Sequence, residues 1–582
     1  MDATPPAFRW LLPAFVAALT FLLYIGTLRF AFVYDDLLLI LANPLVQSWH
    51  YLRTLFQTHM WAFGGPAYPA NYWRPVFMVW LLVNYSLFGA HPLGWHLMAV
   101  LAHVAVALLV YALARRLTGD RISGAVAGLV FGIHPVTIED TAWVLGATES
   151  IVGIFFLASL VMYIDARRQG SRAKLAASVA LFASGLLVKE TAIVLVGMIF
   201  AYVWIYQPGG RKWSDRFLAA VKPCLPYLVV TLVYFPLRMM VLKTLAPPQN
   251  PATLAAMVMT WPPLLWLYLR LLLFPVNMTL YYYLPLVTQF SLRTVLLPAL
   301  PVVGAGVGLC WWARRTWEMP EAGGGELTRG RLVAFATILI VLPLLPVMYL
   351  RALIVGEFAH ARYLHLSCVG LALLVAGALR HIKTGRAELF GRPAPQVAAV
   401  AALILGLGGL NASQQVYWAN NLILFAHAWQ KSPHSIGAMT NLGAELNSRG
   451  RFDEAIAVLN RGLQENPDSW RAHFNLGYAY VATAGWAESE KHLERSIAID
   501  GLNAEQFAYL AVADRNLGKL ERAEWAARQA LQRKPNEPRY HFSLGLILEQ
   551  EGKRAEAAQE YEAELALNPK DRDAREHLAA VR

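Results

Sequence analysis

Two different patterns of apolar and polar residues divide the chain. Residues 1–411 contain eleven apolar stretches of roughly the length that a helix needs to cross the hydrocarbon core of a bilayer. The predicted spans are 8–28, 95–114, 122–136, 148–165, 175–189, 190–206, 221–242, 292–312, 331–350, 364–380 and 395–411. Residues 412–582 instead mix apolar and charged positions in the manner of soluble helices. The pattern predicts an all-α chain in which a polytopic helical membrane domain, residues 1–411, precedes a water-soluble helical domain.

Basic residues gather in alternate connections between these spans. With a cytoplasmic N-terminus, the cytoplasmic connections are Arg115–Arg121, Arg167–Lys174, Arg211–Lys222, Arg314–Arg331 and Arg380–Arg392, and each carries three or four Lys and Arg. The opposite connections are 29–94, 137–147, the turn at Lys189–Glu190, 243–291 and 351–363. They are far poorer in basic residues for their length, as the positive-inside rule requires. Eleven crossings then place residues 412–582 on the extracytoplasmic side.

Two apolar segments need a separate interpretation. Phe8–Leu28 lacks the small-residue cleavage site of a signal peptide and is long enough to span, so we expect it to be the first membrane helix. Counting Trp261–Phe274 as a crossing would invert every later connection and spoil the charge bias. We therefore expect a helix that lies in or dips into the outer interface, with Arg270 reaching the headgroups.

A 34-residue period governs the last third of the chain. Pro433, Pro467, Pro535 and Pro569 fall on one grid, with Gly501 at the remaining point. The pair Leu442-Gly443 recurs as Leu476-Gly477, Leu510-Ala511 and Leu544-Gly545. This is the spacing of tetratricopeptide (TPR) repeats, an α-solenoid of helical hairpins. It predicts a connecting helix in 412–432, four repeats in 433–569 and a capping helix in 570–582.

The repeat array allows a bland and a functional interpretation. Stacked hairpins can serve as a scaffold without chemistry of their own. TPR arrays commonly use their concave groove to hold a partner polypeptide, and this is the interpretation we favour. No single residue of the groove can be singled out as a contact.

Charge and cysteine content exclude some functions. The net charge is +12, but residues 412–582 carry 20 Lys and Arg against 23 Asp and Glu, whereas residues 1–411 carry 30 against 15. The basic excess therefore follows membrane topology, and we expect no nucleic-acid partner. Cys224, Cys310 and Cys368 lie in or beside apolar spans without metal-ligand spacing, and we expect inert thiols.

The few acidic residues of the membrane domain gather on one predicted face. Seven of its 15 fall at outer positions in or beside apolar sequence: Asp35, Asp36, Glu139, Asp140, Glu149, Glu190 and Glu357. Lys189, Arg351 and Arg362 accompany them. Ionisable groups near hydrocarbon are costly and mark functional sites. Carboxylates and cations beside lipid suit a transferase with an anionic lipid-linked donor, in which a carboxylate deprotonates the acceptor and cations hold the departing phosphate.

The first outer connection supplies the candidate base. Asp35 and Asp36 follow the first span in the run FVYDD. Paired carboxylates interact, so that one of them can have a raised pKa. The spacing does not decide which residue acts, and two solvated loop charges are the alternative.

The remaining candidates fall into two groups. For the acceptor or donor-sugar site they are Arg74, His134, Glu139, Asp140 and Glu149, and for the lipid phosphate Lys189, Glu190, Arg351 and Arg362. His134 beside an apolar face is more often a satisfied buried histidine than a ligand. One histidine with one or two carboxylates is too few for a metal site, so no metal ligand is assigned and weak divalent binding stays open. For the second group the alternatives are a charged turn at Lys189–Glu190 and an ordinary loop charge cluster at Arg362.

These segments in this order resemble the transmembrane-and-TPR-containing O-mannosyltransferases and their bacterial relatives. The likeness rests on FVYDD, YWRP, HPVTIED, LLVKE, ARYLHLS and the 34-residue repeats, and covers nearly the whole chain. It implies a GT-C-type membrane fold and inverting transfer of a sugar from a polyprenyl- or dolichyl-phosphate carrier on the extracytoplasmic face. An Asp of the first outer connection is the implied base. Glu139, the Lys189–Glu190 pair and Arg362 match the acidic, Lys-Glu and late Arg positions of that family.

The chain departs from the family pattern at three places. Relatives commonly carry Gly-Arg-Lys/Ala-Asp where this chain has Gly146–Glu149 (GATE), so that a basic residue is missing. Ala361 stands where a Glu often precedes the late Arg, and Ser367 stands where a Pro is common. These departures weaken any inference on the sugar and the acceptor.

We therefore predict a membrane glycosyltransferase that moves a sugar, with mannose as the first candidate, onto a protein hydroxyl held by the TPR groove. A TPR scaffold or secretion factor with a degenerate transferase core is the main alternative, and a lipid-linked-glycan polymerase or ligase the next. A transporter would be expected to place charges in the middle of its spans, whereas these lie at span ends. Compact loops favour a bacterial inner membrane over an endoplasmic reticulum.

Overall fold

The computed structural model describes residues 10–67, 72–206, 212–243, 250, 252–319, 328–353, 356–382, 387–389 and 392–582. The chain forms two compact units, Met1–Leu424 and Phe425–Arg582. The change from membrane domain to repeat array was predicted within the connecting segment 412–432, and the boundary between the units falls there. Each unit is described by itself.

Helices make up almost all of the first unit. Its longer helices are α1 (Leu11–Tyr24), α3 (Pro75–Phe88), α4 (Pro92–Thr118), α5 (Arg121–Ile133), α7 (Ala147–Gln169), α8 (Arg172–Val188), α9 (Val194–Ile205), α11 (Leu225–Leu242), α12 (Leu254–Leu273), α13 (Leu297–Arg315), α14 (Arg329–Val341), α15 (His365–Leu379) and α16 (Ala394–Gln415). Its short helices are α2 (Leu52–Gln57), α6 (Ile138–Ala142) and α10 (Trp213–Val221). Turns of 3-10 or π helix are η2 (Ile25–Arg29), η3 (Leu37–Leu41), η4 (Pro44–Val46), η5 (Trp49–Tyr51), η6 (Ala62–Ala67), η7 (Pro135–Thr137), η8 (Glu190–Ile193), η9 (Lys222–Cys224), η10 (Leu292–Leu296), η11 (Leu342–Met348), η12 (Leu350–Ala352), η13 (Ala361–Leu364) and η14 (Val416–Trp418).

The helices agree with most of the predicted spans. In the described residues nine helices are long and apolar enough to cross a membrane, and the bent pair of α5 with η7 and α6 raises the number to ten. The predicted spans 175–189 and 190–206 correspond to α8, with 17 residues, and to the shorter apolar helix Glu190–Ile205. The all-helical membrane fold is confirmed, whereas the predicted number of eleven crossings stays a prediction.

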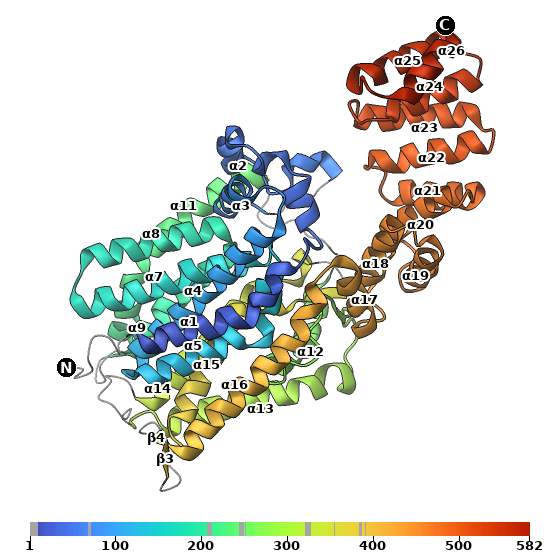
Figure 1. Ribbon diagram of the computed structural model, residues 1–582. Coiled ribbons are helices and arrows are strands. Elements are labelled where there is room, and N and C mark those ends of the chain that lie inside the picture. The colour runs from blue at the N-terminus through green and yellow to red at the C-terminus, as the bar shows by residue number, and fades with distance from the viewer. Residues whose placement is uncertain are drawn as a thin grey trace. The chain divides into compact units, whose positions relative to one another are not determined.

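Close backbone contact holds the centre of the bundle together. α4 packs against α1, α5 and α7, and α15 packs against α5 and α14 (Figure 1). A Cβ atom at Gly124 would lie 3.0 Å from the Tyr111 carbonyl oxygen, and one at Gly128 would lie 3.0 Å from the Ala107 carbonyl oxygen. Small residues let membrane helices approach this closely, and their van der Waals contacts then stabilise the pair.

Connections predicted on the cytoplasmic side meet at one end of the bundle. Arg116 forms a bidentate ion pair with Asp165, with both N–O distances at 2.8 Å. Arg392 pairs with Asp120 at 3.1 Å, and Arg380 donates to the Thr118 carbonyl oxygen at 3.1 Å. The predicted alternation of connections therefore agrees with the way in which the helix ends gather.

The ambiguous segment begins earlier than predicted. Its helix α12 has 20 residues, which is long enough to cross a membrane. Its contacts nevertheless lie with the opposite end of the bundle: the Trp261 indole donates to the Met348 carbonyl oxygen at 3.0 Å, and His134 contacts the Leu272 carbonyl oxygen at 3.1 Å. His134 and Met348 lie at the ends of the predicted spans 122–136 and 331–350 that lead into outer connections. These contacts agree with an interfacial position, which stays a prediction because α12 is long enough to span.

Two small sheets were not predicted. β1 (Tyr282–Leu284) pairs antiparallel with β2 (Gly356–Ala359), with Tyr282 opposite Ala359 and Leu284 opposite Gly356. This ladder joins the fourth and fifth outer connections, 243–291 and 351–363. A second pair, β3 (Glu388–Leu389) and β4 (Arg392–Pro393), lies in the predicted cytoplasmic connection before α16.

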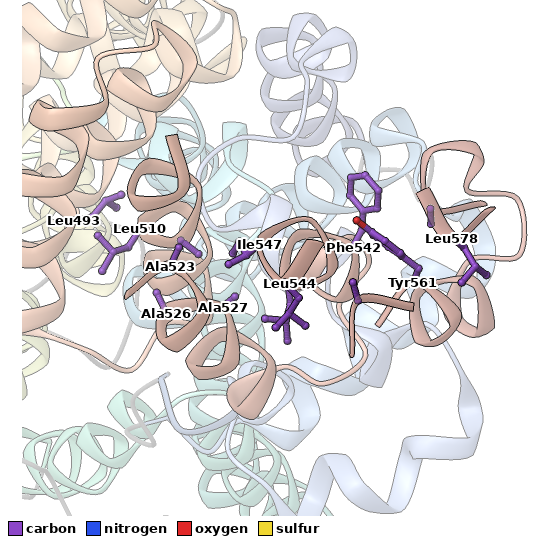
Figure 2. Packing of buried hydrophobic residues seen from close by; sticks show 14 residues of the cluster. Leu493, Leu510, Ala523, Ala526, Ala527, Phe542, Leu544, Ile547, Tyr561 and Leu578 are labelled. Atoms are coloured by element: carbon purple, nitrogen blue, oxygen red, sulfur yellow. The ribbon is translucent and has the colours of Figure 1, made fainter. Parts of the chain in front are cut away.

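The second unit consists of stacked helical hairpins. Its helices are α17 (Asn421–Lys431), which begins in the first unit, α18 (Ile436–Ser448), α19 (Phe452–Glu465), α20 (Trp470–Ala482), α21 (Trp486–Ile499), α22 (Ala504–Asn516), α23 (Leu520–Arg533), α24 (Tyr540–Gln550), α25 (Arg554–Leu567) and α26 (Arg572–Val581). Four hairpins and a terminal helix agree with the predicted repeats. Figure 2 shows the side chains that fill the space between the later helices, among them Leu510, Leu544 and Tyr561.

Candidate active site

The first outer connection places its two carboxylates in different surroundings. Asp36 is completely buried, and its two oxygens accept hydrogen bonds from the Val33 N–H at 3.1 Å and the Leu145 N–H at 3.0 Å. Burial raises the pKa of Asp36 to about 8, although the two backbone donors oppose the shift. Asp35 is partly exposed. Asp36 is therefore buried and joins the first and second outer connections, whereas its neighbour Asp35 is accessible.

The second outer connection carries another pair of adjacent carboxylates. Glu139 accepts hydrogen bonds from the Arg362 guanidinium at 2.5 Å and from the Arg362 backbone N–H at 3.2 Å. Asp140 contacts His365 Nδ1 at 2.8 Å. Both carboxylates are buried. Two consecutive acidic residues of the second outer connection are thus bound to Arg362 in η13 and to His365, the first residue of α15.

Aromatic rings connect this pair with its neighbours. The Arg362 guanidinium lies 5.4 Å from the ring centre of Trp143 and 5.5 Å from that of Tyr363. The Lys189 ammonium lies 5.7 Å from the Tyr363 ring and forms a buried ion pair with Glu149. Cation–π contacts of this kind hold a cation in place where few polar partners are available.

A third carboxylate binds two arginines. Glu190 pairs with Arg74 at 2.9 Å and with Arg238 at 3.9 Å. Arg74 also lies over the Tyr72 ring, 4.5 Å from its centre. The predicted residues Lys189 and Glu190 are therefore not a turn with solvated charges, because each has a buried partner of opposite charge.

The cations around the Lys189–Glu190 turn outnumber the carboxylates bound to them. Arg74, Lys189 and Arg238 contribute three positive charges, and Glu149 and Glu190 contribute two negative charges. We call these five residues the cation cluster. The cation cluster therefore has a net charge of +1, which one phosphodiester group with its single negative charge would neutralise.

Two predicted site residues have other contacts. Both ring nitrogens of His134 bind main chain: Nδ1 accepts from the Val136 N–H at 3.2 Å and Nε2 contacts the Leu272 carbonyl oxygen. Arg351 donates to the Ala252 carbonyl oxygen at 2.5 Å. His134 thus follows the alternative of a satisfied buried histidine, and we leave both residues out of the proposed reaction centre. In the part of the chain that the structure describes, no three His, Cys, Asp or Glu side chains are grouped to hold a metal ion.

Comparison with known proteins decides the family resemblance. Residues 74–237 match the family of dolichyl-phosphate-mannose-protein mannosyltransferases, and residues 443–483 and 510–572 match TPR families. The human protein O-mannosyl-transferase TMTC3 is 25% identical over 96% of this chain and 64% of its own length. Tmtc1 of Drosophila melanogaster is 26% identical over 79% of this chain and 62% of its own length.

The resemblance to the TPR-containing O-mannosyltransferases is confirmed. Tmtc2 of Drosophila melanogaster, a further protein O-mannosyl-transferase, is 33% identical over a shorter region that covers 31% of this chain and 20% of its own length. The chain spans about two-thirds or less of the length of the O-mannosyltransferases that it matches. Its similarity to them therefore covers both units without covering the whole of the relatives.

Sequence reasoning missed some residues that the structure brings to these charged groups. Arg238 interrupts the apolar run of α11, and such an isolated arginine was a usable signal. It lies one residue beyond the mannosyltransferase match, which ends at 237. His365 and Trp143 were also missed, because a histidine or tryptophan beside an apolar span gives no sign of whether it points into the bundle.

Proposed function

We propose that this chain is an inverting membrane glycosyltransferase that moves a sugar, with mannose as the first candidate, from a polyprenyl- or dolichyl-phosphate carrier to a Ser or Thr hydroxyl of a protein. The observation that carries the proposal is a series of ring contacts that leads from the loop of a partly exposed carboxylate, Asp35, to the cation cluster. The Tyr34 ring, next to Asp35 in sequence, lies 5.6 Å from the Trp143 ring, and Trp143 contacts Arg362. Arg362, and Lys189 of the cluster, both lie over the Tyr363 ring. On this proposal the loop of the base and the phosphate-binding cations serve one site.

In the proposed reaction Asp35 accepts the proton of the acceptor hydroxyl. The hydroxyl oxygen forms a bond to the anomeric carbon of the sugar from the face opposite the phosphate. The bond between that carbon and the phosphate oxygen breaks, and its electron pair leaves with the lipid phosphate. Cations of the cluster stabilise the charge that develops on the phosphate. Asp36 holds the first and second connections together and is not the base.

The cation cluster suits a lipid phosphate for two reasons. Its members lie where apolar helices end, at the depth expected for a headgroup. Each cation is already bound to a carboxylate, so that the empty site holds few uncompensated buried charges. A phosphodiester can then take over one guanidinium contact without leaving Glu190 unpaired.

We assign the TPR unit to the protein acceptor and place it with the reaction centre on the extracytoplasmic face. The positive-inside bias of the sequence and the gathering of the acidic residues at the opposite bundle end support this assignment. A bacterial inner membrane remains the favoured host membrane. On this proposal, deleting residues 433–582 abolishes acceptor selection and leaves donor binding intact.

The test is transfer by purified protein in lipid vesicles. Polyprenyl-phosphate mannose labelled in the sugar is supplied with a Ser/Thr-rich peptide, and labelled peptide is counted and its glycosylation site found by mass spectrometry. Asp35→Asn should lower transfer at least about 100-fold, as expected for loss of a general base. Asp215→Asn, the same change at an exposed position of α10, is the matched control and should leave transfer unchanged. Full activity of Asp35→Asn would refute the mechanism, and an inactive but folded wild type would favour the scaffold alternative.

A further inference from the structure

The segment that leaves the last membrane helix contacts the loop of the proposed base. We call residues 416–421, which comprise η14 and the start of α17, the exit segment. The Ala31 N–H donates to the Ala419 carbonyl oxygen at 3.0 Å, and the Tyr34 N–H donates to Asn421 Oδ1 at 2.8 Å. Asn421 is 8% exposed. Two hydrogen bonds thus join the exit segment to Ala31 and Tyr34, more than 380 positions away in sequence.

The second of these bonds acts on an unusual backbone conformation. Tyr34 has a φ of 55°, in the left-handed region that a bulky residue rarely adopts. Such a conformation costs on the order of 1–3 kcal/mol and persists only when the surroundings fix it. Asn421 satisfies the N–H of this residue, and the peptide that follows leads directly into Asp35. The orientation of the Asp35 carboxylate therefore depends on a conformation that Asn421 helps to hold.

A ring contact connects the exit segment to the second outer connection. Trp418 is buried and stacks on Trp143, with 6.3 Å between ring centres and 21° between ring planes. Trp143 in turn contacts Tyr34 on one side and Arg362 on another. The exit segment thus touches the base loop directly and reaches the Arg362–Glu139 pair through one ring.

We infer that Asn421 is a positioning residue that holds the Asp35 carboxylate in place through the Tyr34 backbone, so that the helix entering the TPR unit sets the geometry of the reaction centre. The inference rests on the proposed function. α17 begins at Asn421 and continues into residues 425–431 of the second unit. A force on α17, or an acceptor bound to the TPR unit, that shifts the beginning of α17 would therefore change the orientation of the Asp35 carboxylate without contacting Asp35.

The experiment compares two asparagines in the vesicle assay. Asn421→Ala removes the acceptor of the Tyr34 N–H and should lower kcat about tenfold or more while KM for the lipid donor stays within twofold. Asn460→Ala, the same change at an exposed position of α19, is the matched control, and both kcat and KM should stay near wild type. Equal kcat for the two alanine variants would overturn the inference, and a rise in KM alone would also overturn it.

Two further measurements separate positioning from a loss of folding. Amide hydrogen exchange at Tyr34 should become at least about tenfold faster in Asn421→Ala and stay unchanged in Asn460→Ala. Asn421→Asp keeps an oxygen acceptor, so kcat should be closer to wild type, with the pH–rate profile moved to higher pH because the new charge disfavours ionisation of Asp35. If Asn421→Ala does not fold, the inference is refuted when the pH–rate profile of Asn421→Asp does not move to higher pH. An inactive wild type would instead refute the proposed function, and unchanged Tyr34 exchange would refute the contact itself.

Discussion

Two adjacent aspartates of the first outer connection have different surroundings. Asp35 is partly exposed, whereas Asp36 is completely buried and its two oxygens accept hydrogen bonds from backbone N–H groups of two connections. Sequence predicted the pair but not this division, because residues i and i+1 leave a turn in directions that depend on the backbone. Here the left-handed conformation of Tyr34 determines those directions.

The buried carboxylate gives a prediction with a definite sign. Burial raises the pKa of Asp36 to about 8, above the ordinary value of an unfolded aspartate, so that the folded protein binds the proton more tightly. The resulting stability is fully present at low pH and is lost as pH rises toward 8. The Tm of the wild type should therefore fall relative to that of Asp36→Asn between pH 5 and 8 and level off above. Thermal unfolding in detergent at several pH values measures it; a difference that grows in favour of the wild type would contradict it.

The arginine that sequence reasoning missed supplies a second prediction. Arg238 is 6% exposed and shares Glu190 with Arg74. Replacing it by Gln removes a charge-assisted contact to the proposed phosphate, which is worth about 1.5–3 kcal/mol. KM for the lipid donor should rise by about tenfold or more with a smaller change in kcat. Lys243→Gln, an exposed change one residue past the same helix, should leave both constants near wild type, and an equal effect of the two variants would remove Arg238 from the site.

Helices and repeats were predictable where their sequence pattern is long. A span contains many consecutive apolar residues, and the TPR array repeats the same residue types at a 34-residue period, so both were predicted. β1 and β2, by contrast, have three and four residues, too few for an alternating pattern to appear. α12 begins at Leu254, seven residues before the predicted start, and Pro262 and Pro263 lie inside it although proline is more typical of the first turn of a helix.

The two helices of each TPR hairpin pack through a pair of residues whose sizes vary together from repeat to repeat. A Cβ atom at Gly477 would lie 2.5 Å from Leu493 Cγ, and Gly443 faces Leu459 in the same way. In the third repeat the equivalent positions hold Ala511 and Ala527, 16 residues apart like the others. A larger residue on the first helix of the hairpin is thus accompanied by a smaller one on the second.

This compensation predicts a non-additive pair of changes. Gly477→Ala should lower the free energy of unfolding of residues 425–582 by about 1 kcal/mol or more, because overpacking costs 1–3 kcal/mol and outweighs the gain in helix propensity. Leu493→Ala alone should cost about 2–5 kcal/mol by leaving a cavity. The double variant should lose less than the sum, since it reproduces the third repeat. Urea unfolding of the four proteins tests this, and strict additivity would count against direct packing of the two positions.

At the scale of the whole molecule, the arrangement of the connections agrees with the predicted topology. Predicted cytoplasmic connections bind each other through Arg392–Asp120 and through the Arg168 guanidinium, which donates to the Arg116 carbonyl oxygen. Predicted outer connections bind each other through Glu139–Arg362. Charge bias predicted which connections share a side. It could not predict which residues pair, because that depends on helix rotation, which apolar spans do not reveal.

Labelling of single cysteines tests the orientation. In a Cys310→Ser background, Gln57→Cys in the first outer connection and Asn536→Cys in the repeat array should react with a membrane-impermeant maleimide added outside. Gln169→Cys, in an exposed position at the opposite end, should react only after the membrane is opened. Labels on Gln57→Cys and Asn536→Cys from different sides would refute the proposed placement of the TPR unit.

The charge of the cation cluster has a consequence for turnover. A lipid-phosphate sugar carries one negative charge, but the lipid phosphate left after transfer is a monoester with a charge of about −1.5 to −2 at pH 7. Three cations with two internal carboxylates are balanced by the first ligand and attract the second more strongly. The spent carrier should therefore be a competitive inhibitor that binds more tightly than the donor.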